Sequence, residues 1–219
     1  MSVKVLLLED DELVRSGIRM ILESTEDIEV VAESADGTRA VELADRFRPD
    51  VVLTDVEMPE VDGIEVARLL SRRDPAPAVI MLTTFDVDAY VYAALRHGAA
   101  GFLLKDSSPK ALIEAVRVVA SGEAMISPRI TKRLLSRFAG GSAEQDARAR
   151  LDALTPRERE VSLHIGQGLS NAEIGTALHL SDSTVKVHIG RIKTKLGAAN
   201  RTQIAILVHE AGLGQGTSN

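Results

Sequence analysis

The sequence predicts an α/β domain built on a five-stranded parallel sheet, followed by a smaller all-α domain. Five short apolar runs, near residues 3–8, 28–33, 51–54, 78–82 and 101–104, alternate with helical patterns near 12–24, 37–47, 63–72, 87–98 and 108–121. Four helix start signals then follow one another closely after residue 150. In a doubly wound sheet of strand order 2-1-3-4-5, the first and third strands flank the crevice where ligands bind.

Charged side chains stand where these apolar runs end. Glu9 and Asp10 follow the first run, Asp55 follows the third, and Lys105 follows the fifth. Any one of them has a commoner explanation, such as a helix cap or a surface lysine. Because the carboxyl ends of parallel strands meet at one edge of a sheet, their joint placement indicates one site.

The residue types predict the chemistry of this site. Asp55 can act as a nucleophile toward phosphorus and form an acyl phosphate. Mg²⁺ is bound through carboxylates, carbonyls and waters, so Asp10 and Asp55 are expected as direct ligands, with Glu9 adjacent and the backbone carbonyl of Glu57 in addition. Lys105 offers a positive charge to a phosphoryl group. Thr83, which ends the fourth strand, offers a hydroxyl.

Composition excludes several other classes of protein. Among 219 residues there is no cysteine, which excludes disulfides, thiolate catalysis and cysteine-bound metals. The five histidines form no close pair, so a histidine metal site is not expected. No apolar stretch approaches the roughly 18 residues of a membrane span, and no secretory signal is visible. We therefore expect a cytoplasmic protein without membrane attachment.

The net charge of −6 conceals an asymmetry between the two ends of the chain. Residues 1–124 contain 13 Lys and Arg against 24 Asp and Glu, whereas residues 125–219 contain 13 against 8. The net charges are therefore −11 and +5. An acidic module joined to a basic one is typical of a regulated protein that binds nucleic acid, although ordinary surface variation gives the same totals.

The alternating pattern breaks up after residue 121. A short helix is expected over Ile130–Phe138. Gly140-Gly141-Ser142 and the polar residues after it predict a flexible linker that extends to about Arg150. We therefore divide the chain into a first domain (1–121), a linker (122–150) and a second domain (151–213).

The second domain shows a helix-turn-helix pattern. Thr155-Pro156-Arg157-Glu158 and Ser170-Asn171-Ala172-Glu173 are capping boxes, and Ser181 and Asn200 are further helix starts. In the third helix Val185, Ile189, Ile192 and Leu196 form a buried stripe. The opposite face is basic, and in this geometry it enters the major groove of DNA.

Residues 1–121 resemble the receiver domain of two-component signalling. The resemblance rests on Glu9-Asp10, Asp55 with the following Met58-Pro59 and Asp62-Gly63, Thr83, and Lys105. It implies a flavodoxin-like fold in which Asp55 receives phosphate from the phosphohistidine of a sensor histidine kinase. It further implies that Thr83, Phe102 and Lys105 bind the phosphate or respond to it. Glu9 stands where Asp is common, and Asp106-Ser107 follow Lys105 where many members have Pro.

Residues 151–213 resemble the LuxR/NarL-type DNA-binding domain, through Leu154 to Glu160, Ser170 to Ile174, Ser183 to His188, Lys195 to Gly197 and Arg201 to Gln203. The resemblance implies DNA contacts from this helix, for which the candidates are Ser183, Thr184, Lys186, Val187, Arg191 and Lys193. Gly190 stands where some members have a basic contact residue. Dimer contacts are implied for the last helix, whose apolar stripe is Ile204, Leu207, Val208 and Ala211. Packing in the core of the domain is the alternative for this stripe.

Together the resemblances indicate a response regulator of the NarL/FixJ type and not an enzyme. Such a protein is phosphorylated on Asp55 with Mg²⁺, forms a homodimer and binds promoter DNA.

Three alternatives remain open. A phosphatase of the haloacid-dehalogenase type uses a similar aspartate, but its motif follows the first strand. An autoinducer-binding LuxR regulator has a more aromatic ligand pocket. A receiver that is never phosphorylated would have lost part of the acid–lysine set.

Overall fold

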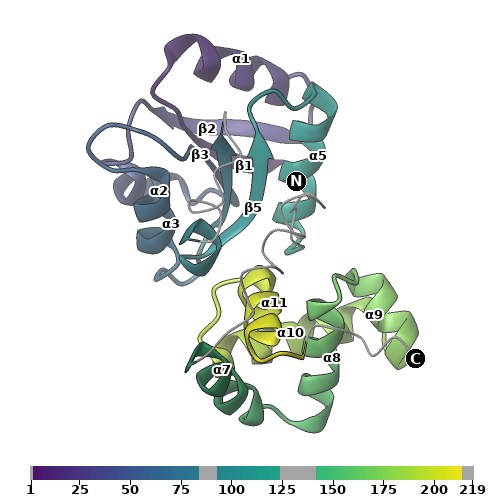
Figure 1. The fold of residues 1–219 in the computed structure, drawn as a ribbon. Coiled ribbons are helices and arrows are strands. Elements are labelled where there is room, and N and C mark those ends of the chain that lie inside the picture. Colours follow the sequence, from purple (N-terminus) through teal and green to yellow (C-terminus); the bar gives the residue numbers. More distant parts are fainter. Residues whose placement is uncertain (1, 84–92, 124–141, 214–219) are drawn as a thin grey trace. The chain divides into compact units, whose positions relative to one another are not determined.

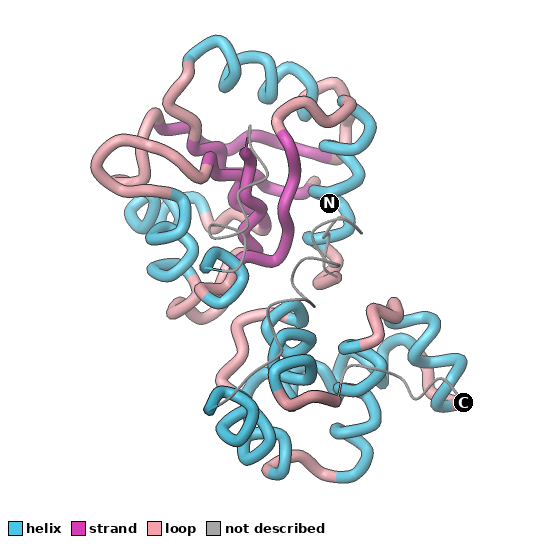
Figure 2. Tube along the Cα trace, viewed as in Figure 1, coloured by secondary structure: helices cyan, strands magenta, loops and turns pink. Residues whose placement is uncertain are grey.

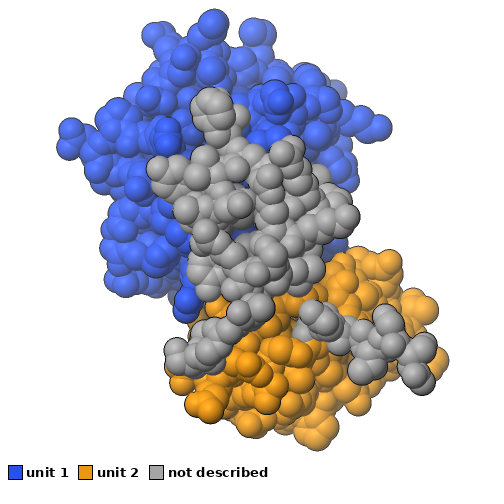
Figure 3. Space-filling model, in the orientation of Figure 1, with its two compact units in different colours: residues 1–130 blue, residues 131–219 orange. Residues whose placement is uncertain are grey.

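The computed structural model describes residues 2–83, 93–123 and 142–213 (Figure 1). The chain divides into two compact units, residues 1–130 and 131–219, which are coloured separately in Figure 3. The first half of the helix predicted near 87–98 and all of the one predicted at Ile130–Phe138 lie outside the described residues.

The first unit contains the predicted parallel sheet. Its strands are β1 (Val3–Leu8), β2 (Ile28–Ser34), β3 (Val51–Asp55), β4 (Ala78–Thr83) and β5 (Ala99–Leu104), and Figure 2 shows them in magenta. All pairings are parallel and the order is β2-β1-β3-β4-β5, which confirms the predicted topology. Leu8 pairs with Thr54, and Asp55 pairs with Leu82. The carboxyl ends of β1, β3 and β4 therefore lie at one edge.

Helices cover both faces of this sheet (Figure 1). α1 (Glu12–Leu22) and α5 (Pro109–Ala120) lie on one face, and α2 (Ala40–Phe47) and α3 (Gly63–Leu70) lie on the other. A buried cluster joins the first pair to the sheet through Leu22, Leu53, Ile80 and Val116, among others. Burial on both faces explains why the strands are continuous apolar runs.

The second unit is entirely helical in its described part. Its helices are α7 (Ser142–Asp152), α8 (Pro156–Gly166), α9 (Asn171–Leu178), α10 (Asp182–Leu196) and α11 (Arg201–Glu210). The four predicted helix starts are confirmed: Thr155 and Ser170 form capping boxes, and Ser181 and Asn200 accept hydrogen bonds from the third residue of their helices. The predicted stripe of α10 is buried.

The predicted linker is wrong over its last part, because residues 142–150 belong to α7. Ala147 and Leu151, one turn apart, are 2% and 1% exposed and join the core of the helical unit. Buried contacts at Ala147 and Leu151 are a weak periodic signal in a mostly polar helix, which is why the composition suggested a linker.

The apolar stripe of α11 belongs to the core of its own unit. Ile204, Leu207, Val208 and Ala211 are at most 6% exposed and all join the same buried cluster. Gly166 of α8 packs so closely on this stripe that a Cβ there would lie 2.5 Å from Cγ1 of Val208. The prediction that these four side chains form a dimer contact is therefore wrong, and the alternative of core packing is correct.

Within the described part of the chain, no helix is long and apolar enough to cross a membrane.

An ion pair between the buried carboxylate of Glu158 and the partly exposed ammonium of Lys195 joins α8 to α10 and makes the stability of the helical unit depend on pH. The Glu158 carboxylate accepts hydrogen bonds from the backbone N–H and hydroxyl of Thr155 and lies 2.6 Å from Nζ of Lys195. The Lys195 bond is the largest cause that lowers the pKa of Glu158 from 4.5 to about 2. A carboxyl with a lowered pKa stabilises the fold above its unfolded pKa, and this contribution is lost as pH falls through the folded pKa.

We expect Glu158→Gln to lower the free energy of unfolding by on the order of 1–3 kcal/mol at pH 7. This difference from wild type should shrink as pH falls from about 4.5 toward 2. Urea unfolding of both chains across this range, followed by helical circular dichroism, measures it. Glu160→Gln is the control, since Glu160 is 51% exposed in its pair with Arg157 and should change little. A difference that is constant with pH would show that the ion pair is not its source.

Candidate functional site

The polar residues that follow β1, β3 and β5 are held in place by the ends of the sheet. The Glu9 N–H donates to the Ser34 carbonyl over 3.1 Å, and the Lys105 N–H donates to the Thr83 carbonyl over 2.8 Å. Asp55 is itself the last residue of β3. Extension of the strand pairing therefore fixes the backbone from which the site residues project.

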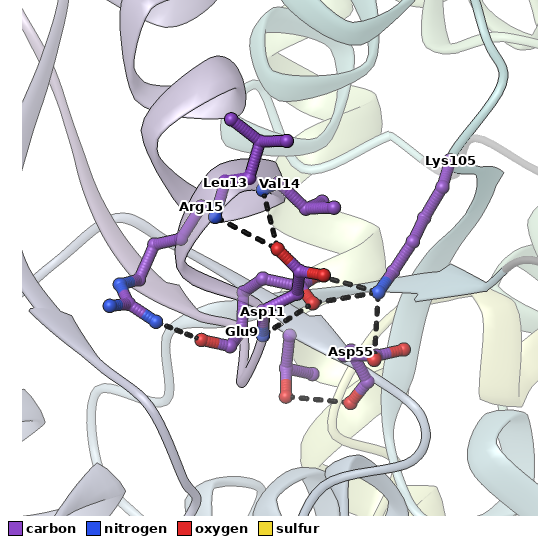
Figure 4. A network of polar contacts seen from close by, with 8 residues as sticks. Glu9, Asp11, Leu13, Val14, Arg15, Asp55 and Lys105 are labelled. Atoms are coloured by element: carbon purple, nitrogen blue, oxygen red, sulfur yellow. Dashed lines mark hydrogen bonds and ion pairs between the residues drawn. The ribbon is translucent and has the colours of Figure 1, made fainter.

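Lys105 connects the two buried carboxylates of the site (Figure 4). Its Nζ lies 2.8 Å from Oδ2 of Asp55 and 2.8 and 2.7 Å from the two carboxylate oxygens of Glu9. Glu9 is fully buried, and the side chains of Asp55 and Lys105 are 10% and 13% exposed. Three charges so close together in a poorly solvated place interact strongly, and two carboxylates to one ammonium leave an excess negative charge.

The pKa values reflect this crowding. Burial is the largest influence on Glu9 and raises its pKa; the hydrogen bond from Lys105 opposes the rise and the Asp55 charge adds to it. For Lys105, burial alone would lower the pKa, but its hydrogen bonds with Asp55 and Glu9 outweigh burial and the net shift is upward. Lys105 is therefore held as a cation, and the site has a surplus of carboxylate for a second cation.

The donor set fits a divalent cation. One oxygen each from Glu9, Asp10 and Asp55 lie within 4.8 Å of one another. Oε2 of Glu9 is buried and accepts no hydrogen bond, although the Lys105 ammonium lies near it. Three clustered carboxylates, two of them buried and one exposed, suit a hard cation that prefers oxygen ligands, such as Mg²⁺.

An open depression adjoins this cluster. Asp10, Glu57, Met58 and Pro59 are among the residues that line it. Glu57 is exposed here, at the start of the loop after β3. Its predicted role as a carbonyl ligand remains a prediction, but its place beside Asp10 is compatible with that role.

The Asp62-Gly63 pair has a structural cause that the sequence did not show. Asp62 caps α3 by accepting the Glu65 N–H over 2.7 Å. Gly63 packs directly on the end of β3, where a Cβ would lie only 2.1 Å from the Asp55 carbonyl oxygen. Any larger residue would push the start of α3 away from Asp55, so the glycine preserves the geometry of the site.

Arg15 and Asp11 support the site but were not predicted for it. The guanidinium of Arg15 donates to the Glu9 carbonyl over 2.6 Å, and the Asp11 N–H donates to Oε1 of Glu9 over 3.3 Å (Figure 4). Asp11 also caps α1, where it accepts the N–H groups of Leu13 and Val14. The only sequence signal for Arg15 was its place in the first turns of the helix beside Glu9-Asp10.

Thr83 and Phe102 lie on the same face of the sheet. β4 and β5 pair in parallel, with Met81 opposite Phe102 and Thr83 opposite Leu104. Since side chains alternate between faces along a strand, Met81, Thr83 and Phe102 share one face. Thr83 is 8% exposed and Phe102 is 3% exposed. The Thr83 hydroxyl, at the edge of the sheet where the site lies, is therefore diagonal to the buried ring of Phe102.

The predicted DNA-contact residues of α10 fall into two groups. Ser183, Lys186, Val187 and Arg191 are exposed, and Thr184 is half-buried. Lys193 departs from the prediction, because it is half-buried and burial lowers its pKa. Gly190 has open space where a Cβ would stand. The exposed face is therefore centred on Val187, which is 53% exposed, with Lys186 and Arg191 on either side.

The fold and the sites define a regulatory protein that joins an acidic phosphoacceptor-type domain to a helical DNA-binding domain. The family model for the response regulator receiver domain matches residues 5–117, and that for bacterial regulatory proteins of the luxR family matches residues 152–208. The chain belongs to the two-component response regulators with a LuxR-type helix-turn-helix domain, which regulate transcription.

Relatives align along nearly the whole chain. The transcriptional regulatory protein DegU of Brevibacillus brevis is 39% identical over 217 residues, which cover 94% of this chain and 92% of DegU. The crystal structure of the response regulator ChrA, from a heme-sensing two-component system, is 37% identical with a TM-score of 0.53 and covers 97% and 98% of the two chains. A complex of the response regulator RcsB with DNA is 25% identical with a TM-score of 0.56 and covers 96% and 99%.

We expect Asp10→Asn to weaken Mg²⁺ binding about tenfold or more, because it removes one of three clustered carboxylates. Isothermal titration of the full chain with MgCl₂ measures the affinity. Asp11→Asn is a matched control, since it removes the neighbouring charge while asparagine can still cap α1. Equal affinities for Asp10→Asn and wild type would exclude Asp10 as a ligand.

Proposed function

We propose that Asp55 is the phosphoacceptor of this response regulator and that a partner sensor histidine kinase supplies the phosphoryl group from a phosphohistidine. The observation that carries the proposal is the placement of Asp55. It is buried at the end of β3, within 2.8 Å of the Lys105 ammonium and beside two further carboxylates. An aspartate that only ended a strand or began a turn would not need an ammonium and two further carboxylates beside it.

The transfer follows from this arrangement. A carboxylate oxygen of Asp55 attacks phosphorus, the bond between phosphorus and the histidine nitrogen breaks, and the histidine retains the electron pair of that bond. Asp10, Asp55, Glu9 and the Glu57 carbonyl would hold Mg²⁺, which would supply positive charge to the phosphoryl oxygens. Lys105 keeps its proton and moves from neutralising carboxylates to neutralising phosphate.

Phosphorylation is then communicated along the face of the sheet shared by Thr83 and Phe102. The Thr83 hydroxyl follows the phosphoryl group at the edge of the sheet. Its displacement opens space next to Met81, into which the ring of Phe102 can rotate. Such a two-state change alters the surface formed by β4, β5 and their helices and favours a homodimer.

The dimer provides the contacts that one helix-turn-helix lacks. Each copy places α10 in a major groove, and two half-sites of promoter DNA lie roughly 10 base pairs apart. Contacts are proposed for Ser183, Thr184, Lys186, Val187 and Arg191. Lys193 is a weaker candidate, since its ammonium is half-buried. With chromosomal DNA and a histidine kinase as partners, the chain acts in the cytoplasm as a regulator and not as an enzyme.

We expect acetyl phosphate with Mg²⁺ to add one alkali-labile phosphate to the wild-type chain and none to Asp55→Asn. Intact mass spectrometry measures the addition. Asp62→Asn is the control; it removes a nearby carboxylate from the depression but keeps a side chain that caps α3, and it should be phosphorylated normally. Phosphate remaining on Asp55→Asn would assign the acceptor to another residue.

We expect phosphorylation to raise both the sedimentation coefficient and the affinity for promoter DNA. Thr83→Ala should accept phosphate on Asp55 but show less dimer, because the hydroxyl that follows the phosphoryl group is missing. Sedimentation velocity and fluorescence anisotropy, with and without acetyl phosphate, measure the two properties. Asp55→Asn is the control that should not respond. Equal mass and affinity in both states of the wild type would mean that the two domains are uncoupled.

A further inference from the structure

Basic side chains cap the helices of the second unit at their carboxyl ends. His209 bonds to the carbonyl of Gly166 at the end of α8, and Arg157 donates to that of Leu178 at the end of α9. Arg150 donates to the carbonyl of Leu196 at the end of α10, and Arg148 donates to that of Ala211, which follows α11. The last carbonyls of a helix lack partners inside it and carry a partial negative charge, so hydrogen-bond donors suit these positions, and the three arginines are cationic donors.

Two of these caps come from α7, which lies outside the matched family segment of residues 152–208. The apolar stripe of α7 is Ala147 and Leu151. Arg148 and Arg150 leave the helix on opposite sides of this stripe, at about 80° to either side of it for a helix of 3.6 residues per turn. They therefore reach different targets, α11 and α10 respectively.

The carboxyl end of α10 shows what Arg150 contributes. Gly197 adopts a left-handed conformation, with φ of 58°, and the N–H groups of Gly197 and Ala198 satisfy the carbonyls of Thr194 and Lys193. This capping motif leaves the Leu196 carbonyl to be satisfied from outside the helix. The Arg150 guanidinium donates a hydrogen bond to the Leu196 carbonyl. Lys195, one residue earlier, is bound to Glu158 of α8.

The exposed contact face of α10 lies toward the other end of the helix, from Ser183 to Arg191. The carboxyl end of α10 is restrained by the Lys195–Glu158 ion pair and by the Arg150 contact, so loss of Arg150 removes one of two polar restraints there. Displacement of recognition groups by about 1 Å weakens directional contacts strongly. Readout of base edges depends on such directional contacts, whereas phosphate attraction depends on charge.

We propose that Arg150 is a positioning residue for DNA recognition: it anchors the carboxyl end of α10 to α7, so that α7 is a working part of the DNA-binding domain. This inference rests on the proposed function, in which α10 reads DNA. Arg150 does not contact DNA itself. Loss of Arg150 lowers the affinity for the specific DNA sequence. The affinity for non-specific DNA, which comes from the charge of the basic surface, stays nearly unchanged.

The test compares Arg150→Met with Arg148→Met in the full phosphorylated chain. Both substitutions remove a guanidinium from the same helix and release one helix-end carbonyl, but only the first concerns α10. The probes are a duplex selected by the wild-type chain from random sequence and a scrambled duplex of the same composition. Fluorescence anisotropy gives the ratio of the two affinities, and thermal unfolding gives the stability of each variant.

We expect Arg150→Met to bind the selected duplex about tenfold more weakly and the scrambled duplex within about twofold of wild type. Arg148→Met should lose comparable stability but keep the affinity ratio. Arg150→Lys, which keeps a cationic donor, should recover much of the lost ratio. Should Arg150→Met fail to fold, Arg150→Gln and Arg148→Gln repeat the comparison with a donor weaker than guanidinium.

Two results would overturn the inference. An unchanged ratio in the Arg150 variants would show that the contact does not position α10, and an equal loss in the Arg148 variants would show a general effect of stability. A wild-type chain that selects no sequence would instead refute the proposed function, and the inference with it.

Discussion

The ammonium of Lys105 between the carboxylates of Glu9 and Asp55 is the interaction on which the receiver site depends. Two buried carboxylates next to each other repel, and without a cation one of them would have to take up a proton. The Lys105 ammonium offsets the repulsion between the carboxylates of Glu9 and Asp55. The three groups together still carry one net negative charge, and Asp10 adds another. The site is therefore stable without metal and still attractive to a divalent cation. The site also suits a phosphoryl group, because the same ammonium can exchange a carboxylate for a phosphoryl oxygen.

This cluster exists because the fold delivers its members from distant parts of the sequence. Glu9 and Lys105 are 96 residues apart, yet both follow parallel strands that end at the same edge. The close packing of Gly63 on the Asp55 carbonyl adds a local constraint, since it brings the capped start of α3 against the end of β3. The chemistry of the site thus depends on the strand order and on the absence of a side chain at Gly63.

The fold was largely predictable because its signals are local and repeated. The buried strands are continuous apolar runs, and the helices of the second unit begin with capping residues. The failures have physical reasons as well. Among the described side chains of α7, Ala147 and Leu151 are the buried apolar contacts in a polar sequence, and its arginine caps on α10 and α11 are contacts between residues far apart. The stripe on α11 has the same spacing whether it faces a partner or its own core, so periodicity alone could not decide between them.

The candidate site was predictable in its members but not in its energetics. Asp55, Asp10, Glu9 and Lys105 were identified from strand ends. Full burial of Glu9, its upward pKa shift and its support from Arg15 follow from packing that a single sequence does not show. Lys193 illustrates the opposite case: its spacing suggested the exposed face of α10, whereas its side chain is half-buried and burial lowers its pKa.

Fewer cationic side chains of the second half of the chain are available to contact DNA than its net positive charge suggests. Arg148, Arg150, Arg157 and Arg201 donate to carbonyls within the helical unit, and Lys195 is paired with Glu158. On the exposed face of α10 Lys186 and Arg191 remain, and Lys186 is itself 2.9 Å from Asp182. Since each phosphate contact contributes a limited and salt-sensitive amount to affinity, the two exposed cations on the described face of α10 offer a single copy only a limited attraction to DNA. Two copies held together share one binding event and gain affinity by effective concentration. Internal use of arginine for helix capping therefore favours the proposed dimer as the form that binds DNA, and in that proposal control of the dimer through Asp55 would control DNA occupancy.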